Sequence, residues 1–338
     1  MTGKVGSAPP LGDAQLREML RRMLRIRYFE EAALRLKAQG RIPGAIHPSI
    51  GQEGEIVGAC LALRPDDYMI GNHRSHGHPI AKGAMLEGLM AELLGKVTGV
   101  NHGKGGSLHL CDVSVGSLGE TSSVGSGLPI AVGAALGAKR MGTDRVCLCF
   151  FGEGAANEGT FHESLNLAAL WAVPAIFLCE NNLYGGCTSA DREMRLTNIA
   201  QRAHVYGMPG ESVDGQSAIA VHQSVSRAVA RARAGAGPSL IEAKTYRYLE
   251  HAVGMALPSY RDEREVAEWR RRDPLALHRA ALREAQVQTD GQAAAVETQE
   301  RAQAEAAVEF ALASPFPEPH TAFEQLYSTP VRVRPGSH

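Results

Sequence analysis

Two short apolar segments, 145–151 and 173–180, constrain the fold of this chain of 338 residues more than any other feature. Each has the length and composition of a strand that is buried on both faces, as in a parallel sheet. Between them lie a glycine-rich loop, 152–159, and a stretch of helical composition. Strand, helix and strand at this spacing predict a βαβ unit. We therefore expect an α/β fold with a mostly parallel sheet flanked by helices.

The segments on either side of this pattern differ from it in composition. Residues 1–40 predict a loose tail and then a helix with Asp13 as its N-cap, and residues 262–338 predict a C-terminal helical segment and tail. The α/β domain should then span 41–261, with a third strand at 239–248 and no second sheet domain. We expect the arginines on one face of the first helix to be solvated: Arg17, Arg21, Arg22 and Arg25.

The overall charge excludes some classes of partner. The chain has 35 basic and 36 acidic residues, so nothing favours a nucleic-acid or membrane-surface partner. The six cysteines show no paired spacing and mostly lie in apolar segments, as is typical of reduced thiols. The first residues lack the apolar stretch of a signal peptide. We predict a soluble cytoplasmic protein.

Oxygen-bearing side chains follow both predicted strands directly. Glu153 comes after the first strand, and Asn182 comes 29 positions later, after the second. Both loops should leave the same edge of a parallel sheet, which brings a carboxylate and an amide oxygen to one crevice. Such hard oxygens suit Mg²⁺. Because Gly152, Gly154 and a helix N-terminus lie beside them, the sequence predicts a site for a magnesium diphosphate.

These residues also resemble a known family. GEGAANEG (152–159) followed by ENNLYG (180–185) is similar to the thiamine-diphosphate signature, usually GDG and a distant NN. Over roughly residues 15–328 the chain resembles the alpha subunit of the 2-oxo acid dehydrogenase first component, of the pyruvate and acetoin type. The supporting stretches are GQEGEIVGA (51–59), NHRSHGHPIAKG (72–83), GKGGSLHL (103–110), NLAALWAVPAIFLCENNLYG (166–185) and TYRYLEH (245–251).

The resemblance implies thiamine diphosphate and Mg²⁺ as cofactors. It assigns Glu153, Asn182 and the carbonyl of Tyr184 as metal ligands. It assigns Arg74 as a partner of the diphosphate, for which a guanidinium fork is well suited. The backbone that touches the diphosphate is implied to be that of Gly152, Gly154 and Ala155.

The resemblance assigns further positions around the cofactor. His73 stands where the family often has a tyrosine, and Ser122 and Val124 match backbone positions that hold the aminopyrimidine ring. His251 matches a histidine that lies over the diphosphate and faces the active-site channel, where it can move protons. Two more histidines match channel positions near the substrate: His47 and His76.

Two departures bear on this assignment. The usual metal-binding aspartate is Glu153, one methylene longer, so either the loop is set back or metal binding is weaker. The usual YHGHS is YLEHA, so Leu249 and Glu250 change the channel wall. The second departure concerns the substrate more than the cofactor.

The resemblance implies an enzyme that decarboxylates a pyruvate-like 2-oxo acid, or cleaves acetoin, and passes the acyl unit to a lipoyl acyltransferase. The cofactor supplies the carbanion chemistry and the protein supplies position and electrostatics. Activation of the cofactor needs a carboxylate from a second α/β domain, which this chain lacks. We therefore expect an oxidoreductase that is active only with a beta subunit, as an α2β2 heterotetramer.

Two other hypotheses remain open from the sequence. The chain could be a subunit of a carboligase that donates a two-carbon unit to a carrier protein or another acceptor, which the change at Glu250 allows. It could also be a non-catalytic scaffold that kept the fold, for which Glu153 is the one supporting feature. The particular 2-oxo acid is not specified by the sequence.

Overall fold

A computed structural model gives the fold of residues 11–324 and of residue 329. Its centre is a sheet of six strands in the order β2-β1-β3-β4-β8-β7, and every neighbouring pair is parallel. The strands are β1 (Tyr68–Asn72), β2 (Ser117–Thr121), β3 (Cys147–Gly152), β4 (Ala175–Asn181), β7 (Gly210–Asp214) and β8 (Ser239–Lys244). The expected α/β fold with a parallel sheet is confirmed.

Helices cover both faces of this sheet. The α-helices are α1 (Asp13–Ala38), α2 (Glu53–Leu61), α3 (Gly77–Lys82), α4 (Leu86–Leu93), α5 (Gly127–Arg140), α6 (Gly159–Leu170), α7 (Ala190–Glu193), α8 (Ala218–Arg233), α9 (Glu263–Arg270), α10 (Pro274–Glu284) and α11 (Asp290–Ala313). Five 3₁₀ segments are η1 (Gly106–Leu108), η2 (Val113–Val115), η3 (Glu153–Asn157), η4 (Ile199–Tyr206) and η5 (Pro319–Phe323). A small hairpin joins β5 (Tyr184–Gly185) to β6 (Thr188–Ser189).

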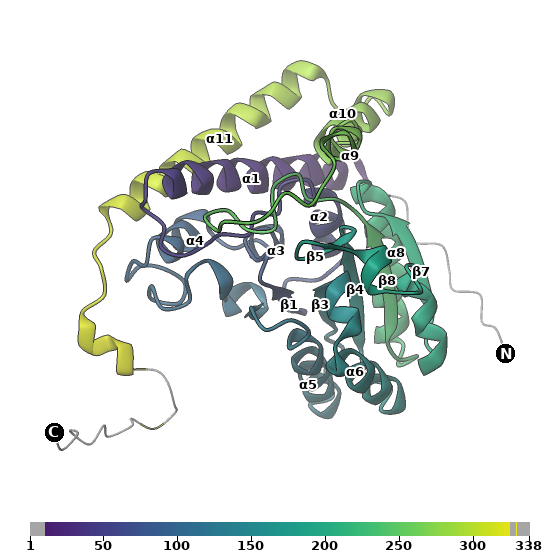
Figure 1. The fold of residues 1–338 in the computed structure, drawn as a ribbon. Helices are drawn as coiled ribbons and strands as arrows, with labels where there is room; N and C mark the ends of the chain where they lie inside the picture. Colours follow the sequence, from purple (N-terminus) through teal and green to yellow (C-terminus); the bar gives the residue numbers. More distant parts are fainter. Residues whose placement is uncertain (1–10, 325–328, 330–338) are drawn as a thin grey trace.

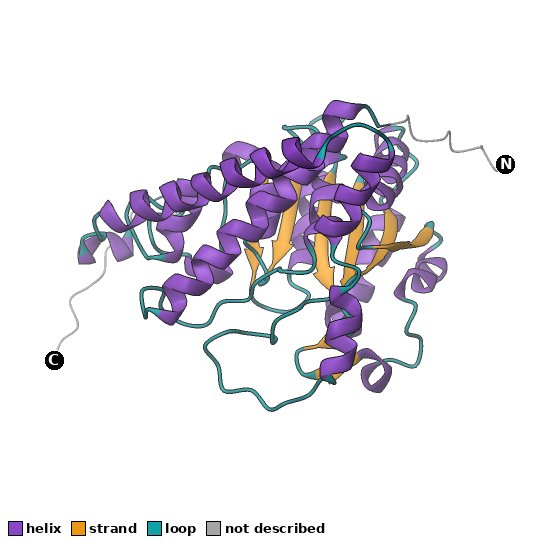
Figure 2. Ribbon diagram, turned by 90° about the horizontal axis from the view of Figure 1, so that it is seen from above, coloured by secondary structure: helices purple, strands orange, loops and turns teal. Residues whose placement is uncertain are grey.

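The core is divided into two parts by the sheet. Along β3, Leu148 and Phe150 pack against α1, α2, α4 and α8, whereas Cys149 and Phe151 pack against α5 and α6. Figure 1 shows these two groups of helices on opposite sides of the strands, and Figure 2 shows the long helices lying over the sheet when it is seen from above. Burial of alternate side chains on both faces explains the continuous apolar runs that predicted β3 and β4.

The C-terminal helix α11 lies along α1, and this contact corrects one expectation (Figure 1). Glu300 on α11 is fully buried and binds Arg25 Nε at 2.6 Å and Arg21 Nη1 at 3.2 Å. Arg17 donates to the carbonyl of Val287 at 2.7 Å. The prediction of a solvated arginine face was therefore wrong for Arg21 and Arg25, because they bind a residue that lies 279 and 275 positions further along the chain. Arg17 is exposed, as predicted.

Two boundaries also differ from the sequence prediction. Asp13 is the first residue of α1, and Gly12 is its N-cap, whose amide donates to Gln15 Oε1 at 3.2 Å. The third predicted strand, 239–248, ends at Lys244, and the remaining residues form a loop. This loop carries Arg247 and His251.

The thiols of the chain agree with the expectation of unpaired cysteines. All six cysteines are free, and four are buried in the core: Cys60, Cys147, Cys149 and Cys179. Within residues 11–324, none of the helices combines the length and the apolar character needed to cross a membrane.

Candidate cofactor and metal site

A cavity of about 520 Å³ lies at the carboxyl edge of the sheet, over β1, β3 and β4. This volume is in the range of natural cofactor sites. Loops that follow separate strands converge on it, as expected for a parallel sheet. Nearly all of the residues predicted for the site line it: His47, His73, Arg74, Ser122, Val124, Gly152, Glu153, Gly154, Ala155, Asn182, Tyr184 and His251.

The loop after β4 has an unusual backbone conformation at Leu183. This residue has φ of 73°, in the left-handed region that residues other than glycine rarely adopt. Its amide donates to Asn181 Oδ1 at 3.1 Å, which stabilises the turn. A strained residue at this point indicates that the placement of its neighbours is under functional constraint. Those neighbours are Asn182 and Tyr184, two of the three expected metal ligands.

Glu153, the third expected ligand, is buried at the start of η3. Its Oε2 accepts a hydrogen bond from the amide of Asn182 at 3.0 Å, so the two predicted ligands meet across 29 positions of sequence. Burial raises the pKa of Glu153 to about 7, although two backbone amides favour its charged form. Within the described residues no basic side chain lies within 4.0 Å of this carboxylate. A divalent cation would supply the missing positive charge.

Arg247 is a site residue that the sequence analysis did not identify. Its buried guanidinium donates from Nε to Asn182 Oδ1 at 3.2 Å and from Nη2 to the carbonyl of Tyr184 at 3.4 Å. It also donates to the carbonyl of Gly186. The residue falls inside the predicted strand 239–248, so no loop position or spacing in the sequence singled it out.

Arg74 carries a second buried guanidinium, and its side chain lines the cavity. It donates from Nη1 to the carbonyl of Pro48 at 2.9 Å and from Nη2 to the carbonyl of His251 at 3.3 Å. Burial, and then the positive charge of Arg247, lowers the pKa of Arg74 to about 9. Among the residues that the structure describes, no carboxylate lies within 4.0 Å of either guanidinium. Two buried cations of this kind favour the binding of an anion.

Three histidines line the cavity: His47, His73 and His251. For each of them burial, followed by the nearby arginine charge, disfavours the protonated ring. The pKa is lowered to about 4 for His47, to about 2 for His73 and to about 3 for His251. All three rings are neutral at pH 7, so each has one unprotonated ring nitrogen.

His76 does not line the cavity, which corrects its expected position in the channel. It is fully buried, with Nδ1 at 2.7 Å from Glu30 Oε2 and Nε2 at 2.8 Å from Ser107 Oγ. Glu30 also accepts hydrogen bonds from the amide and hydroxyl of Ser49. His76 therefore connects α1 to the loop that carries Arg74, which makes it a positioning residue.

A buried acidic cluster beneath the cavity was also missed. His78 lies between Glu120 and Glu180, with ring nitrogens at 3.2 and 3.0 Å from their carboxylates. Burial opposes its charged form, but the carboxylates of Glu180 and Glu120 raise the pKa of His78 to about 10. Glu180 lies on β4, two residues before Asn182, so this ion-paired cluster supports the loop that follows β4.

Comparison with known proteins identifies the family of the chain. The profile of the dehydrogenase E1 component family matches residues 21–320. The chain belongs to that family. The expected relationship to E1 alpha subunits is thereby confirmed, as is the expectation of an enzyme subunit. The E1 family implies thiamine diphosphate, in agreement with a cavity that combines buried cations with oxygen ligands.

Three curated relatives of the E1 chain cover most of its length. It is 49% identical over 238 residues to the alpha subunit of acetoin:2,6-dichlorophenolindophenol oxidoreductase from Bacillus subtilis, covering 70% of this chain and 72% of that protein. Identity to the subunit of the same name from Cupriavidus necator is 40%, over 95% and 96% of the two chains. Identity to the pyruvate dehydrogenase E1 component subunit alpha of Rhizobium meliloti is 39%, over 88% and 86%.

Proposed function

We propose that this chain is the α subunit of a Mg²⁺- and thiamine-diphosphate-dependent dehydrogenase for a pyruvate-like 2-oxo acid or acetoin. The observation that carries the proposal is the buried guanidinium of Arg74, which lines the cavity, has no carboxylate within 4.0 Å in the described chain and feels the positive charge of Arg247. Burying such charges is unfavourable unless an anion binds beside them. A diphosphate supplies that anion, and its own charge is shared with a metal on the adjacent oxygen ligands.

Different residues of the cavity would bind the metal, the diphosphate and the ring. Glu153, Asn182 and the carbonyl of Tyr184 would hold Mg²⁺, and Arg74 with the backbone of Gly154 would hold the diphosphate. Ser122 and Val124 line the same cavity, and we propose that they hold the aminopyrimidine ring. The bound cofactor supplies carbanion chemistry at the substrate carbonyl. His47 and His251, neutral at pH 7, are placed to move protons at that carbonyl.

The proposed β partner is supported by the exposed surface next to the cavity. On α5, Ile130 is 46% exposed, and an added Cβ at Gly133 or Gly137 would meet nothing within 4 Å. Val124, at the cavity rim, is 52% exposed. Gly133 and Gly137 therefore do not serve close packing within the described chain. A second subunit on this face would cover the pyrimidine end and supply the missing carboxylate, as an α2β2 assembly requires.

The dehydrogenase function is favoured over the carboligase alternative by the position of Glu250. This carboxylate lies 3.5 Å from Arg261 and does not line the cavity, so it does not reshape the channel as the sequence suggested. The relatives named above include both acetoin and pyruvate enzymes, and we propose a lipoyl group on an acyltransferase as the acyl acceptor. The free buried cysteines support a cytoplasmic location.

The test is to co-express the chain with a β-like chain and to assay acetoin and a series of 2-oxo acids with 2,6-dichlorophenolindophenol as acceptor. We expect turnover that requires thiamine diphosphate, Mg²⁺ and both chains. The matched control is the Asn182→Ala assembly, which should bind the β chain but lose turnover. Full turnover by the isolated chain would contradict the half-site, and turnover without thiamine diphosphate would contradict the cofactor.

A further inference from the structure

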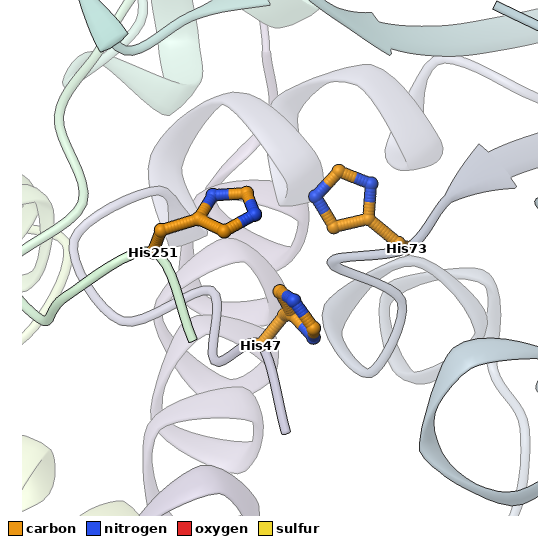
Figure 3. A group of neighbouring side chains, drawn as sticks. All are labelled: His47, His73 and His251. Carbon is orange, nitrogen blue, oxygen red and sulfur yellow. The ribbon is translucent and has the colours of Figure 1, made fainter. Parts of the chain in front are cut away.

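Three histidines from three separate segments converge in the cavity. His47 precedes α2, His73 follows β1 and His251 lies beyond β8. Figure 3 shows their rings pointing toward one another. The ring centroids are 5.0 Å apart for His47 and His73, 5.1 Å for His47 and His251, and 5.4 Å for His73 and His251. One nitrogen of each ring lies within 4.8 Å of the others.

These separations match a tetrahedral metal with three imidazole ligands. A metal–nitrogen bond of about 2.0–2.1 Å puts each ring centroid roughly 3.2 Å from the metal, and tetrahedral angles then put the centroids roughly 5.2 Å apart. The observed distances of 5.0, 5.1 and 5.4 Å lie around that value. In such a site the bonded nitrogens lie roughly 3.4 Å apart. The nitrogens here lie within 4.8 Å of one another, so the rings would turn inward to bind.

The chemistry of the group favours a metal other than magnesium. Neutral imidazole is a ligand for Zn²⁺, Ni²⁺ and Cu²⁺, whereas Mg²⁺ takes oxygen ligands. His47 is only 8% exposed, and its Nδ1 is buried without a hydrogen-bond partner. A buried nitrogen of this kind is costly unless it gains a ligand.

The two nearby guanidiniums oppose a cation at this point. Arg74 and Arg247 both act on the histidines with positive charge, so a bare divalent ion would be repelled. Three protein ligands, however, leave the fourth position of a tetrahedral metal open. An anion there, such as hydroxide, would face both arginines and offset part of the repulsion.

We propose that His47, His73 and His251 form a second metal site, which binds one Zn²⁺-like transition metal with an open fourth position. It is distinct from the oxygen site at Glu153 and Asn182. A further part of the proposal rests on the proposed function: the metal and thiamine diphosphate compete. The imidazoles that would lie over the diphosphate cannot keep that position while they are turned inward onto a metal. Zinc would then act as an inhibitor of cofactor loading.

Cobalt titration of the full chain, produced without a histidine tag, tests the metal site. Co²⁺ is a probe whose visible absorption distinguishes tetrahedral from octahedral coordination. In buffer with Mg²⁺ and without cofactor, we expect one equivalent of tetrahedral Co²⁺ that Zn²⁺ displaces. His73→Tyr, His47→Ala and His251→Ala should each weaken binding at least tenfold, whereas His204→Ala, at an exposed histidine elsewhere, should leave it unchanged.

Several outcomes would overturn the site. They are purely octahedral absorption, the absence of saturable binding, and equal Co²⁺ affinity in wild type and in the three cavity variants. Far-UV circular dichroism checks that each variant is folded. If His73→Tyr is not, His73→Gln replaces it with a side chain of smaller volume, and the same tenfold loss is expected.

Competition is measured separately, so that the two proposals can fail independently. Thiamine diphosphate added to the Co²⁺-loaded chain should reduce the tetrahedral absorption as the cofactor saturates. If the cofactor binds the metal-free chain but leaves that absorption unchanged, competition is wrong. If the cofactor does not bind the metal-free chain or its complex with a β chain, the proposed function is contradicted, while the cobalt result still decides the metal site.

Discussion

Arg247 Nε donates a hydrogen bond to Asn182 Oδ1 at 3.2 Å, and the same guanidinium reaches the carbonyl of Tyr184 at 3.4 Å. One buried side chain thus contacts two of the three oxygens proposed to hold Mg²⁺. Its positive charge opposes a metal, but its rigid fork fixes the loop whose Leu183 is in the left-handed conformation. We expect the positioning effect to dominate, because a bidentate fork restricts geometry in a way that a single point charge cannot.

Arg247→Lys tests that balance. It retains the charge but loses the fork, so the affinity for magnesium thiamine diphosphate should fall by about tenfold or more, that is by about 1.4 kcal/mol or more. Calorimetry of the αβ assembly at several Mg²⁺ concentrations measures this. Arg283→Lys, at an exposed site on α10, is the matched control. An unchanged or higher affinity in Arg247→Lys would show that the guanidinium of Arg247 does not fix the loop that carries Asn182 and Tyr184.

Arg74→Met should separate stability from cofactor binding. The buried guanidinium has only carbonyl partners, so a neutral side chain of similar length should leave the free chain as stable or raise its stability by about 1 kcal/mol. Cofactor affinity should fall at least tenfold, because the diphosphate loses a charged partner. Thermal melting without cofactor and calorimetry with it give the two values. A loss of both stability and affinity would contradict the idea that Arg74 awaits an anion.

Asn182→Ala removes one proposed metal ligand and leaves the other two. We expect the dependence of cofactor binding on Mg²⁺ to disappear, with an affinity loss of about 10²-fold or less when Mg²⁺ is present. Glu153→Asp, which shortens the carboxylate to the length usual in the family, should be tolerated. Calorimetry with and without Mg²⁺ distinguishes the variants. Equal affinity of wild type and Asn182→Ala under both conditions would remove Asn182 from the metal site.

His78→Gln tests the charged cluster beneath the cavity through pH. The pKa of His78 rises from its ordinary 6.5 to about 10 in the folded chain, so its stabilisation is fully present below about 6.5 and is lost as the pH rises through about 10. At pH 7.5 the variant should be less stable by about 3 kcal/mol, because it leaves buried carboxylates without a cation. The difference should narrow toward pH 10.5.

Chemical denaturation of both proteins from pH 7.5 to 10.5 measures this difference. His78 is one of the groups that lower the pKa of Glu120, so its loss moves the titration of this carboxyl up into the same range. Repeating the series in a Glu120→Gln background, with and without His78→Gln, removes that contribution. A difference in unfolding free energy that is constant over the range would mean that His78 is neutral in the folded chain.

Gly133→Leu tests the exposed face of α5. An added side chain meets nothing in this chain, so the isolated subunit should fold normally, while assembly with a β chain should be abolished. Gly133→Ala should stabilise the isolated subunit by roughly 0.5–1 kcal/mol, since alanine is the better helix former. Size-exclusion chromatography with a β chain measures the assembly. Ala295→Leu, at an exposed position on α11, is the control. Normal assembly of Gly133→Leu would place the interface elsewhere.

The parts of the fold that the sequence predicted are those with a local pattern. Strands β3 and β4 are continuous apolar runs because both of their faces are buried. Three strands were missed: β1, which lies inside the sheet, and the edge strands β2 and β7. β1 is only five residues long, GESVD in β7 is mostly exposed, and SLGET in β2 contains both glycine and glutamate. Their place in the sheet depends on neighbours far away in the chain.

The same distinction, between a local sequence pattern and dependence on distant neighbours, applies to the residues of the candidate site. Glu153 and Asn182 could be placed by topology, because each directly follows a recognisable strand. Arg247 and His78 could not, since their roles depend on which buried groups surround them: carbonyl and amide oxygens for Arg247, and two carboxylates for His78. The buried position of His76 depends likewise on Glu30, 46 positions earlier, and no spacing rule relates the two.

The position of β8 has a consequence for synthesis on the ribosome. It is the last strand of the central sheet to be made, yet it lies between β4 and β7, which are made earlier. A nascent chain that ends before residue 239 has two unpaired strand edges facing a gap, a state that is prone to non-native association. Arg247 and His251 follow β8, so a cofactor can stabilise the chain only after this strand has been inserted. Protection of the earlier strands during translation must therefore come from another source, such as a chaperone or the partner subunit.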